Sequence, residues 1–351
     1  MKSSAFPAII IAFLLLVTTA AFASDKKNGD HHSSDNHIKI GLVSSEGGFV
    51  FGGFNHLAFA GFERAAYSHE FYAESRESAD LDDIRTNIAY FVDEGFDLII
   101  TVGYQSQQYI VEAANQNPNI YFALIDSRPE NGPDNLSSFV YQVDQAAFLS
   151  GFLAAWWATE QNNDSPLAGW VGGPPYEEIE KFRIGYESGV AFYNEAHNGR
   201  VEVRGEYTSG FMRPEEGYAI GKRLADEGAS VIFPFAGITG YGALNAALER
   251  GMWAIGVDTD QVYSYPAMAN QLLTSCIKNI DNTVYDLIQT FVQNGGWGGE
   301  TVHYGTLENG DVDLAPFHYF EGNLTDELRQ ELETIRTGII NGAIATGWGQ
   351  E

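Results

Sequence analysis

The chain has 351 residues and a formal net charge of −28, from 47 aspartates and glutamates against 19 lysines and arginines. This balance argues against nucleic acid or an anionic membrane as a partner, because both attract positively charged surfaces. Acidic residues occur along the whole chain, and a saline habitat is one hypothesis for them. The length exceeds what one hydrophobic core usually serves, so two lobes are expected.

The N-terminus has the pattern of a secretory signal. Lys2 provides a positive start, residues 5–20 an apolar core, and residues 21–23 (Ala-Phe-Ala) a cleavage site. The apolar stretch is short for a membrane span. The only cysteine, Cys276, lies far from the cleavage site and has no partner for an internal disulfide. We therefore predict a signal peptide over residues 1–23 and a mature periplasmic protein without a lipid anchor.

Residues 24–37 contain no apolar side chain and are predicted to form a flexible leader. His31, His32 and His37 could bind a metal loosely, but nothing nearby fixes the geometry of a metal site. A solvated linker is the preferred interpretation, and we predict neither a metal nor a cofactor.

From residue 38 onward, apolar runs of strand length alternate with segments of helical periodicity. Strands are predicted at 38–43, 71–73, 97–103 and 120–126. Between them, one helix is predicted to begin near Asn55, a second to begin with the acidic segment 78–83, and a third to include residues 109–114. The cycle then restarts: helices are predicted over 147–158, 182–194, 214–226 and 242–250, with strands at 167–173, 202–204, 231–237 and 253–257. A last helix over 325–345 has Asn323 or Thr325 as its N-cap and buries Leu328, Leu332, Ile335 and Ile339.

Such alternation is typical of parallel sheets with right-handed crossovers, so two successive sets predict two similar α/β lobes that face a cleft. This is the architecture of periplasmic binding proteins. Lobe 1 is predicted to comprise residues 38–146 and about 258–292, and lobe 2 residues 147–257 and about 293–351. The cleft is the expected ligand site.

Polar residues follow two of the apolar runs. The run 253–257 ends at Asp258, Asp260 and Gln261, and Lys278 follows a second run. Ligands of open α/β sheets gather beyond the carboxyl ends of strands. A carboxylate accepts hydrogen bonds from a vicinal diol and an ammonium donates to the same oxygens, so Asp258 and Lys278 suit a ribose. A plain salt bridge beside a helix N-cap explains the spacing equally well.

Two other strand ends carry candidate site residues. Tyr104 and Gln105 follow the strand that ends at Gly103, so they are expected to line the cleft. Asp126 ends the next strand, and it either caps the following segment or reaches the site.

Several motifs resemble the basic membrane protein (Bmp) family of ABC-transporter substrate-binding proteins, whose characterised members bind purine nucleosides. The likeness runs from about Ile38 to Ile344 and is carried in order by residues 52–55 (GGFN), 122–126 (FALID), 148–154 (FLSGFLA), 172–173 with Phe182 and Gly185, 236–240 (AGITG), 256–261 (GVDTDQ) and 275–278 (SCIK). The resemblance implies a two-lobed fold of the type I periplasmic-binding class. It also implies a membrane permease as partner, ligand capture by lobe closure, and a monomer.

The resemblance also implies a set of ligand contacts. Phe54 would stack on the base with Asn55 beside it, Phe211 would cover the other face, Asp258 and Lys278 would hold the ribose, and Gly237 would bring backbone close to the ligand. Three of these residues also have a simpler interpretation. Phe54 and Phe211 could be core aromatics, and Asn55 could be a helix N-cap.

Phe51 departs from the family pattern, which usually has an acidic residue three places before the stacking aromatic. A phenylalanine cannot accept a hydrogen bond from a base N–H. The sugar end of the predicted site is therefore intact and the base end is altered. A free nucleobase, a furanose sugar or another small heterocycle stays as an alternative ligand.

An enzyme is the rival class of function. The chain has no H-E-x-x-H, G-x-S-x-G or phosphate-loop motif. The tight acidic cluster of Asp80, Asp82 and Asp83 fits the first turn of a helix better than the calcium site of a nucleoside hydrolase. The sequence therefore predicts a binding protein without a catalytic site.

Overall fold

The structure is a computed structural model that describes residues 37–162, 164–297 and 301–349. The predicted signal peptide (1–23) and residues 24–36 of the predicted leader lie outside this part. Residues 37–351 form one compact unit. Among the described residues, none of the helices combines the length and the apolar character that crossing a membrane requires.

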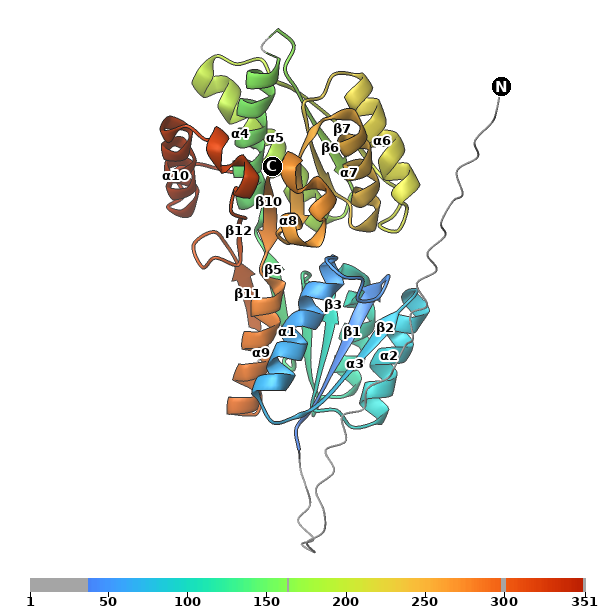
Figure 1. The fold of residues 1–351 in the computed structure, drawn as a ribbon. Coiled ribbons are helices and arrows are strands. Elements are labelled where there is room, and N and C mark those ends of the chain that lie inside the picture. The colour runs from blue at the N-terminus through green and yellow to red at the C-terminus, as the bar shows by residue number, and fades with distance from the viewer. Residues whose placement is uncertain (1–36, 163, 298–300, 350–351) are drawn as a thin grey trace, which may run out of the picture. The chain divides into compact units, whose positions relative to one another are not determined.

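Two six-stranded sheets form the two lobes (Figure 1). The sheet of lobe 1 has the strand order β11-β5-β4-β3-β1-β2, formed by β1 (Lys39–Glu46), β2 (Tyr72–Ser78), β3 (Leu98–Val102), β4 (Tyr121–Ile125), β5 (Leu136–Tyr141) and β11 (Thr301–Gly305). The helices of this lobe are α1 (Phe54–Ser68), α2 (Leu81–Asp93), α3 (Gln107–Gln116) and α9 (Ile280–Asn294), with the short 3-10 helix η1 (Tyr104–Ser106).

The sheet of lobe 2 has the order β12-β10-β9-β8-β6-β7, formed by β6 (Leu167–Gly172), β7 (Glu202–Tyr207), β8 (Val231–Phe235), β9 (Trp253–Asp258), β10 (Leu272–Lys278) and β12 (Val312–Leu314). Its helices are α4 (Val143–Gln161), α5 (Glu177–His197), α6 (Pro214–Asp226), α7 (Ile238–Arg250), α8 (Gln261–Ser264) and α10 (Asp326–Ile340), with the 3-10 helices η2 (Pro266–Gln271) and η3 (His318–Asn323). The predicted two-lobed α/β fold is confirmed.

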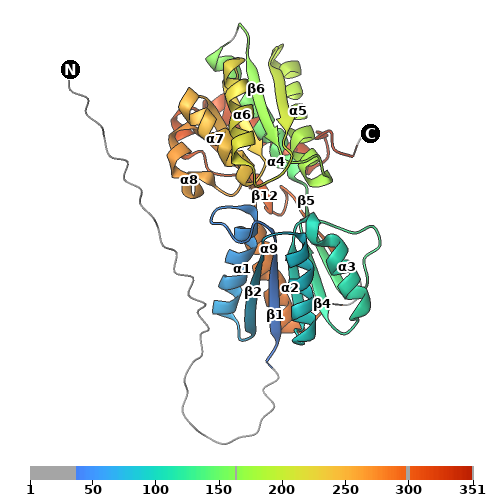
Figure 2. The same cartoon turned by 90° about the vertical axis from the view of Figure 1, so that its right-hand side faces the viewer.

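The central strands of each sheet are buried on both faces, as expected for parallel strands linked by helices, whereas the edge strands β2 and β7 are partly exposed. One edge pair, β10 with β12, is antiparallel. In β3 every residue is buried: Ile100 and Val102 join the core under α1 and α9, whereas Ile99 joins the core under α2 and α3. α9 lies against α1 in both views (Figure 1 and Figure 2). In lobe 2, Figure 2 shows α6 and α7 on one side of the sheet and α5 on the other.

Three glycines explain how α4 and α5 pack so closely. A Cβ atom on Gly151 would lie 2.0 Å from the carbonyl oxygen of Tyr186, and one on Gly189 would lie 2.0 Å from that of Phe148. A Cβ on Gly185 would likewise clash with backbone of α4. The motif at 148–154 and Gly185 therefore act in helix packing.

The predicted last helix is α10, and both its cap and its buried face are as predicted. Thr325 Oγ1 accepts a hydrogen bond from Leu328 N at 3.1 Å. The four apolar residues of its predicted face are all buried. The elements β5, α8, α9, β11 and β12 are among those that had no counterpart in the prediction.

The lobe assignment differs from the prediction in two segments. β10, expected in lobe 1, lies in the lobe 2 sheet because it pairs in parallel with β9. β11, expected in lobe 2, pairs with β5 at the edge of the lobe 1 sheet. α9 lies in lobe 1, where its segment was expected. The chain thus passes between lobes at β5–α4, at β10–α9 and at β11–β12.

Candidate functional site

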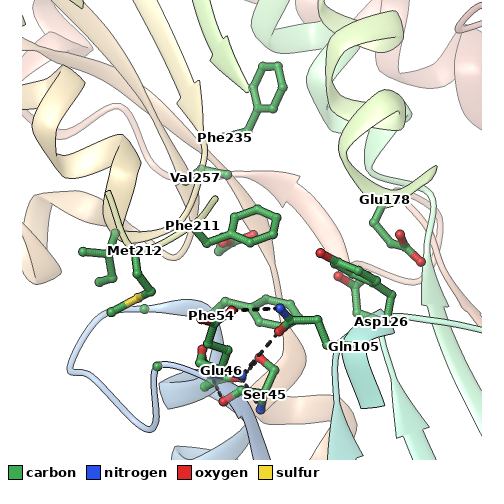
Figure 3. Close-up of a pocket in the computed structure, with 18 of the residues that line it drawn as sticks. Ser45, Glu46, Phe54, Gln105, Asp126, Glu178, Phe211, Met212, Phe235 and Val257 are labelled. Atoms are coloured by element: carbon green, nitrogen blue, oxygen red, sulfur yellow. Dashed lines mark hydrogen bonds between the residues drawn. The ribbon is translucent and has the colours of Figure 1, made fainter. Parts of the chain in front are cut away.

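A pocket lies between the carboxyl ends of strands from both sheets (Figure 3). We call it the interlobe pocket. Its lining side chains from lobe 1 include Ser45, Glu46, Phe54, Asn55, Tyr104, Gln105 and Asp126, and those from lobe 2 include Glu178, Phe182, Phe211, Met212, Phe235, Val257, Asp258 and Lys278. Gly237 contributes backbone. Of the nine predicted ligand-binding residues, the pocket brings together all except Phe51.

Two phenylalanines from different lobes form an aromatic slot. Phe54 is the first residue of α1, and Phe211 lies in the loop between β7 and α6. Figure 3 shows the two rings one above the other across the pocket. Tyr104 adds a third aromatic surface, with its ring centroid 6.5 Å from that of Phe211. A flat ligand inserted between Phe54 and Phe211 would stack on both.

At one end of the slot, Lys278 pairs with Asp126. Lys278 Nζ lies 2.6 Å from Asp126 Oδ2, and both side chains are buried. The ammonium is also 5.4 Å from the Phe54 ring centroid and 5.0 Å from that of Phe182. Burial alone would lower the pKa of Lys278, but the carboxylates of Asp126 and Asp258 outweigh it and raise that pKa above its usual value.

Asp258 and Glu178 complete this end of the pocket. Burial raises the pKa of Asp258 to about 6, and Asp126 adds to the increase while Lys278 opposes it. Burial followed by the charge of Asp126 also raises the pKa of Glu178. We refer to Asp126, Glu178, Asp258 and Lys278 as the carboxylate–lysine cluster. It holds three acidic groups against one ammonium.

Asp126 and Asp258 share an unusual backbone conformation. Their φ angles are 61° and 63°, in the left-handed region that residues other than glycine rarely adopt. Asp126 directly follows β4 in lobe 1, and Asp258 is the last residue of β9 in lobe 2. Such strain is concentrated at binding sites, where the surrounding structure holds a side chain in position.

Asn55 holds the loop between β1 and α1, and it is not the N-cap of α1. The N-cap is Gly53. Asn55 Oδ1 accepts from Ser45 Oγ at 2.8 Å, and Nδ2 donates to the carbonyl oxygen of Gly48 at 3.0 Å. The alternative prediction of an N-cap is therefore wrong, because the amide group is engaged by the chain before the helix.

Phe51 lies outside the pocket lining. Its side chain is 69% exposed and meets the ring of His56 edge-on. In the run after β9, Asp260 also turns away from the pocket, because Oδ2 lies 2.6 Å from His318 Nε2 and Oδ1 accepts from Val262 N. Asp258 is thus the carboxylate of this run that lines the pocket.

Four polar or polarisable lining residues were not predicted from the sequence, namely Ser45, Glu46, Glu178 and Met212. Glu46 ends β1, Glu178 lies in the first turn of α5, and Met212 follows Phe211. The signal that could have found Glu46 is the one that found Asp258, namely a position at the carboxyl end of a strand. Glu178 lies six residues after β6 ends, so the same rule does not single it out. Nothing in the sequence singles out Met212.

Comparison with known proteins gives a consistent family. The model of the family described as "Bmp: ABC transporter substrate-binding protein PnrA-like" matches residues 41–346. Basic membrane protein B of Borreliella burgdorferi is 33% identical over 78% of this chain and 74% of its own length. The CD4+ T-cell-stimulating antigen of Listeria innocua is 28% identical over 96% of this chain and 95% of its own.

Solved structures agree with this result. A crystal structure of an ABC transporter solute-binding protein from Aeropyrum pernix has a TM-score of 0.80 at 25% identity, covering 88% of this chain and 92% of its own. A solute-binding protein from Conexibacter woesei, with a TM-score of 0.64 at 20% identity over 88% of this chain and 98% of its own, shares the fold. With a family match over most of its length and a two-lobed fold around a pocket, this chain belongs to the Bmp (PnrA-like) family of ABC transporter substrate-binding proteins.

Proposed function

We propose that the interlobe pocket binds a purine nucleoside, which the protein delivers to the membrane permease of an ABC importer. The observation that carries the proposal is the position of Asp258 and Lys278 at one end of the slot between Phe54 and Phe211. The cluster supplies acceptors and a donor for a vicinal diol, and the slot supplies two apolar faces for a base. Stacking on aromatic side chains contributes about 1–3 kcal/mol per base.

The charge of the lining favours an uncharged ligand. Among the residues that the structure describes, the lining has four carboxylates, Glu46, Asp126, Glu178 and Asp258, and one cationic side chain, Lys278. Lys278 already pairs with Asp126. A phosphate brought into this pocket would meet an excess of like charge, whereas a nucleoside would not.

Contacts between the lobes support capture by closure. Tyr241 of lobe 2 donates a hydrogen bond to the carbonyl oxygen of Gly52 in lobe 1 at 3.2 Å. The rings of Tyr104 and Tyr176, one from each lobe, have centroids 4.1 Å apart. A ligand that touches both lobes favours the closed state by its differential affinity for that state.

The place of action follows from the proposed signal peptide over residues 1–23. Its cleavage would release the chain into the periplasm, where it would act as a monomer without a lipid anchor. The permease would recognise the closed form, so that ligand-free protein does not compete for it.

A thermal-shift screen of residues 24–351, refolded to remove bound ligand, tests the proposal. The panel holds purine and pyrimidine nucleosides, free bases, ribose and related sugars. A ligand at 100 times its Kd adds about 2.7 kcal/mol to the free energy of unfolding, which is measured as an increase of several degrees in Tm. A shift with purine nucleosides and none with free bases or ribose is expected. A shift confined to bases, sugars or other heterocycles would contradict the nucleoside assignment.

A further inference from the structure

We propose that Glu46 and Gln105 together recognise the edge of the base, selecting ligands whose ring carries an N–H donor beside a hydrogen-bond acceptor. We call these residues the Glu46–Gln105 pair. The inference rests on the proposed nucleoside function and goes beyond it, because it names the part of the ligand that decides specificity.

The pair has a fixed internal geometry. Gln105 Nε2 donates to Glu46 Oε2 at 3.1 Å, and Gln105 Oε1 accepts from the backbone N of Glu46 at 3.3 Å. These two bonds determine which way the Gln105 amide points. Within the described ranges, the second carboxylate oxygen of Glu46, Oε1, accepts no hydrogen bond. A carboxylate oxygen and an amide N–H are thus presented side by side in the pocket lining.

Local backbone features aim both side chains at the pocket. In β1, Val43 pairs with Arg76 and Glu46 pairs with Ser78, so β1 has one more residue than β2 over this stretch. An irregularity of this kind re-aims the side chains that follow it. Gln105 lies in η1, which begins after Gly103, a glycine with a φ of 79°.

The pair lies at the opposite end of the slot from the carboxylate–lysine cluster. β3 lies between β4 and β1, so Asp126, which follows β4, and Glu46, which ends β1, are two strand spacings apart, about 10 Å. Phe54 lies between them, because a Cβ on Gly103, the residue that follows β3, would be 3.5 Å from Phe54 Cε1. A ligand whose hydroxyls meet the cluster and whose ring covers Phe54 therefore directs its far edge at Glu46 and Gln105.

The chemistry of the pair defines the ligand edge. The carboxylate accepts from an N–H group, and the Gln105 amide donates to an adjacent ring nitrogen or carbonyl oxygen. The amino group and neighbouring ring nitrogen of adenosine place a donor beside an acceptor, and the ring N–H and carbonyl of inosine place them in the opposite order, so a pair of fixed geometry favours one of these two nucleosides. Purine riboside has the same ring and sugar but no donor at this edge. It therefore leaves the carboxylate without a partner, as happens whenever a site built for a hydrogen bond receives a ligand that lacks the group.

Calorimetric titration of the refolded protein with adenosine, inosine and purine riboside tests the inference. In wild type, whichever of adenosine and inosine has the higher affinity is expected to bind at least tenfold more tightly than purine riboside. About tenfold is the usual effect of one charge-assisted hydrogen bond. In Glu46→Gln this preference is expected to shrink to threefold or less, mainly through weaker binding of the preferred nucleoside. Glu63→Gln makes the same charge change on the exposed side of α1 and is expected to leave the preference unchanged.

The outcomes separate the two proposals. Nucleoside binding by wild type with equal affinity for purine riboside, or with a preference that Glu46→Gln retains, overturns the role of the pair and leaves the proposed function in place. No binding of any nucleoside overturns both. If Glu46→Gln does not fold, as judged by circular dichroism, Gln105→Met replaces it, because it removes the donor, and the same loss of preference is required.

Discussion

Lys278 and Asp126 form an ion pair that joins the two lobes inside the interlobe pocket. Lys278 ends β10 of lobe 2 and Asp126 follows β4 of lobe 1, and only 3% and 8% of their side chains are exposed. Taking both charges out of water is costly, and their mutual attraction offsets that cost only in good geometry. A diol that also bonds Asp258 would complete the coordination of Lys278, which couples ligand binding to the contact between lobes.

Removing the Lys278 amine is expected to weaken nucleoside binding. Lys278→Ala should cost about 1.5–3 kcal/mol of binding free energy, because hydrogen bonds to a charged group are lost. Calorimetric titration measures this difference. Lys222→Ala removes an exposed lysine of α6 and is the control. Equal affinities of Lys278→Ala and wild type would remove Lys278 from the site.

Replacing Asp258 should stabilise the empty protein. Burial raises the pKa of Asp258 from 3.8 to about 6, so folding disfavours its charged form. The stability of wild type relative to Asp258→Asn should therefore fall by about 3 kcal/mol as the pH rises from about 4 to about 6, and then level off. Asparagine also tolerates the left-handed backbone at this position. Urea denaturation at several pH values measures the effect, and a difference that does not vary with pH would contradict it.

Ionisation of Asp258 should lower the stability of the empty protein but increase its affinity for the ligand. Ionised Asp258 is the better acceptor for a diol, so nucleoside affinity in wild type should decrease as the pH falls below about 6. Asp258→Asn should bind weakly, with little change between pH 5 and pH 8. A wild-type Kd that is constant over this range would indicate that Asp258 does not contact the sugar.

Phosphorylated ligands should be rejected. Four carboxylates line the pocket against one lysine that is already paired, so AMP should bind at least tenfold more weakly than adenosine. 5′-O-methyladenosine separates charge from size, because it adds bulk without charge. Equal weakening by the methyl group and by the phosphate would point to a steric cause.

The contact between α4 and α5 should not tolerate a side chain at Gly151. A Cβ there would lie 2.0 Å from the carbonyl oxygen of Tyr186, so Gly151→Ala must move one helix. A loss of at least about 1–3 kcal/mol of stability is expected, as for other overpacked cores. Gly322→Ala is the matched control, since a Cβ at Gly322 meets nothing within 4 Å. Equal Tm values for the two variants would contradict this account of the motif at 148–154.

The class of fold could be predicted from the sequence alone. The alternation of strand-length apolar runs with segments of helical periodicity depends only on residues that are neighbours in the sequence. α10 shows this most clearly: the Thr325 cap and its buried face could both be predicted from a short segment. The strand-end rule also directed attention to Asp126, Asp258 and Lys278, since ligands of parallel sheets meet the carboxyl edge whatever the details of packing. Glu46, which obeys the same rule, was overlooked because the predicted strand stopped at residue 43, before the irregularity in β1.

Only the tertiary structure decided what depends on pairing between distant segments. The sheets to which β10 and β11 belong follow from partners that no local window contains. The bond between Lys278 and Asp126 joins residues 152 positions apart, and the contact between Glu46 and Gln105 exists because β1 lies beside β3. The raised pKa of Asp258 likewise depends on its burial in the folded chain and on the charge of Asp126 from lobe 1, and the exposure of Phe51 depends on the course of its loop. Sequence supplied the chemical groups at the strand ends, whereas long-range packing determined which of them meet and how their charges interact.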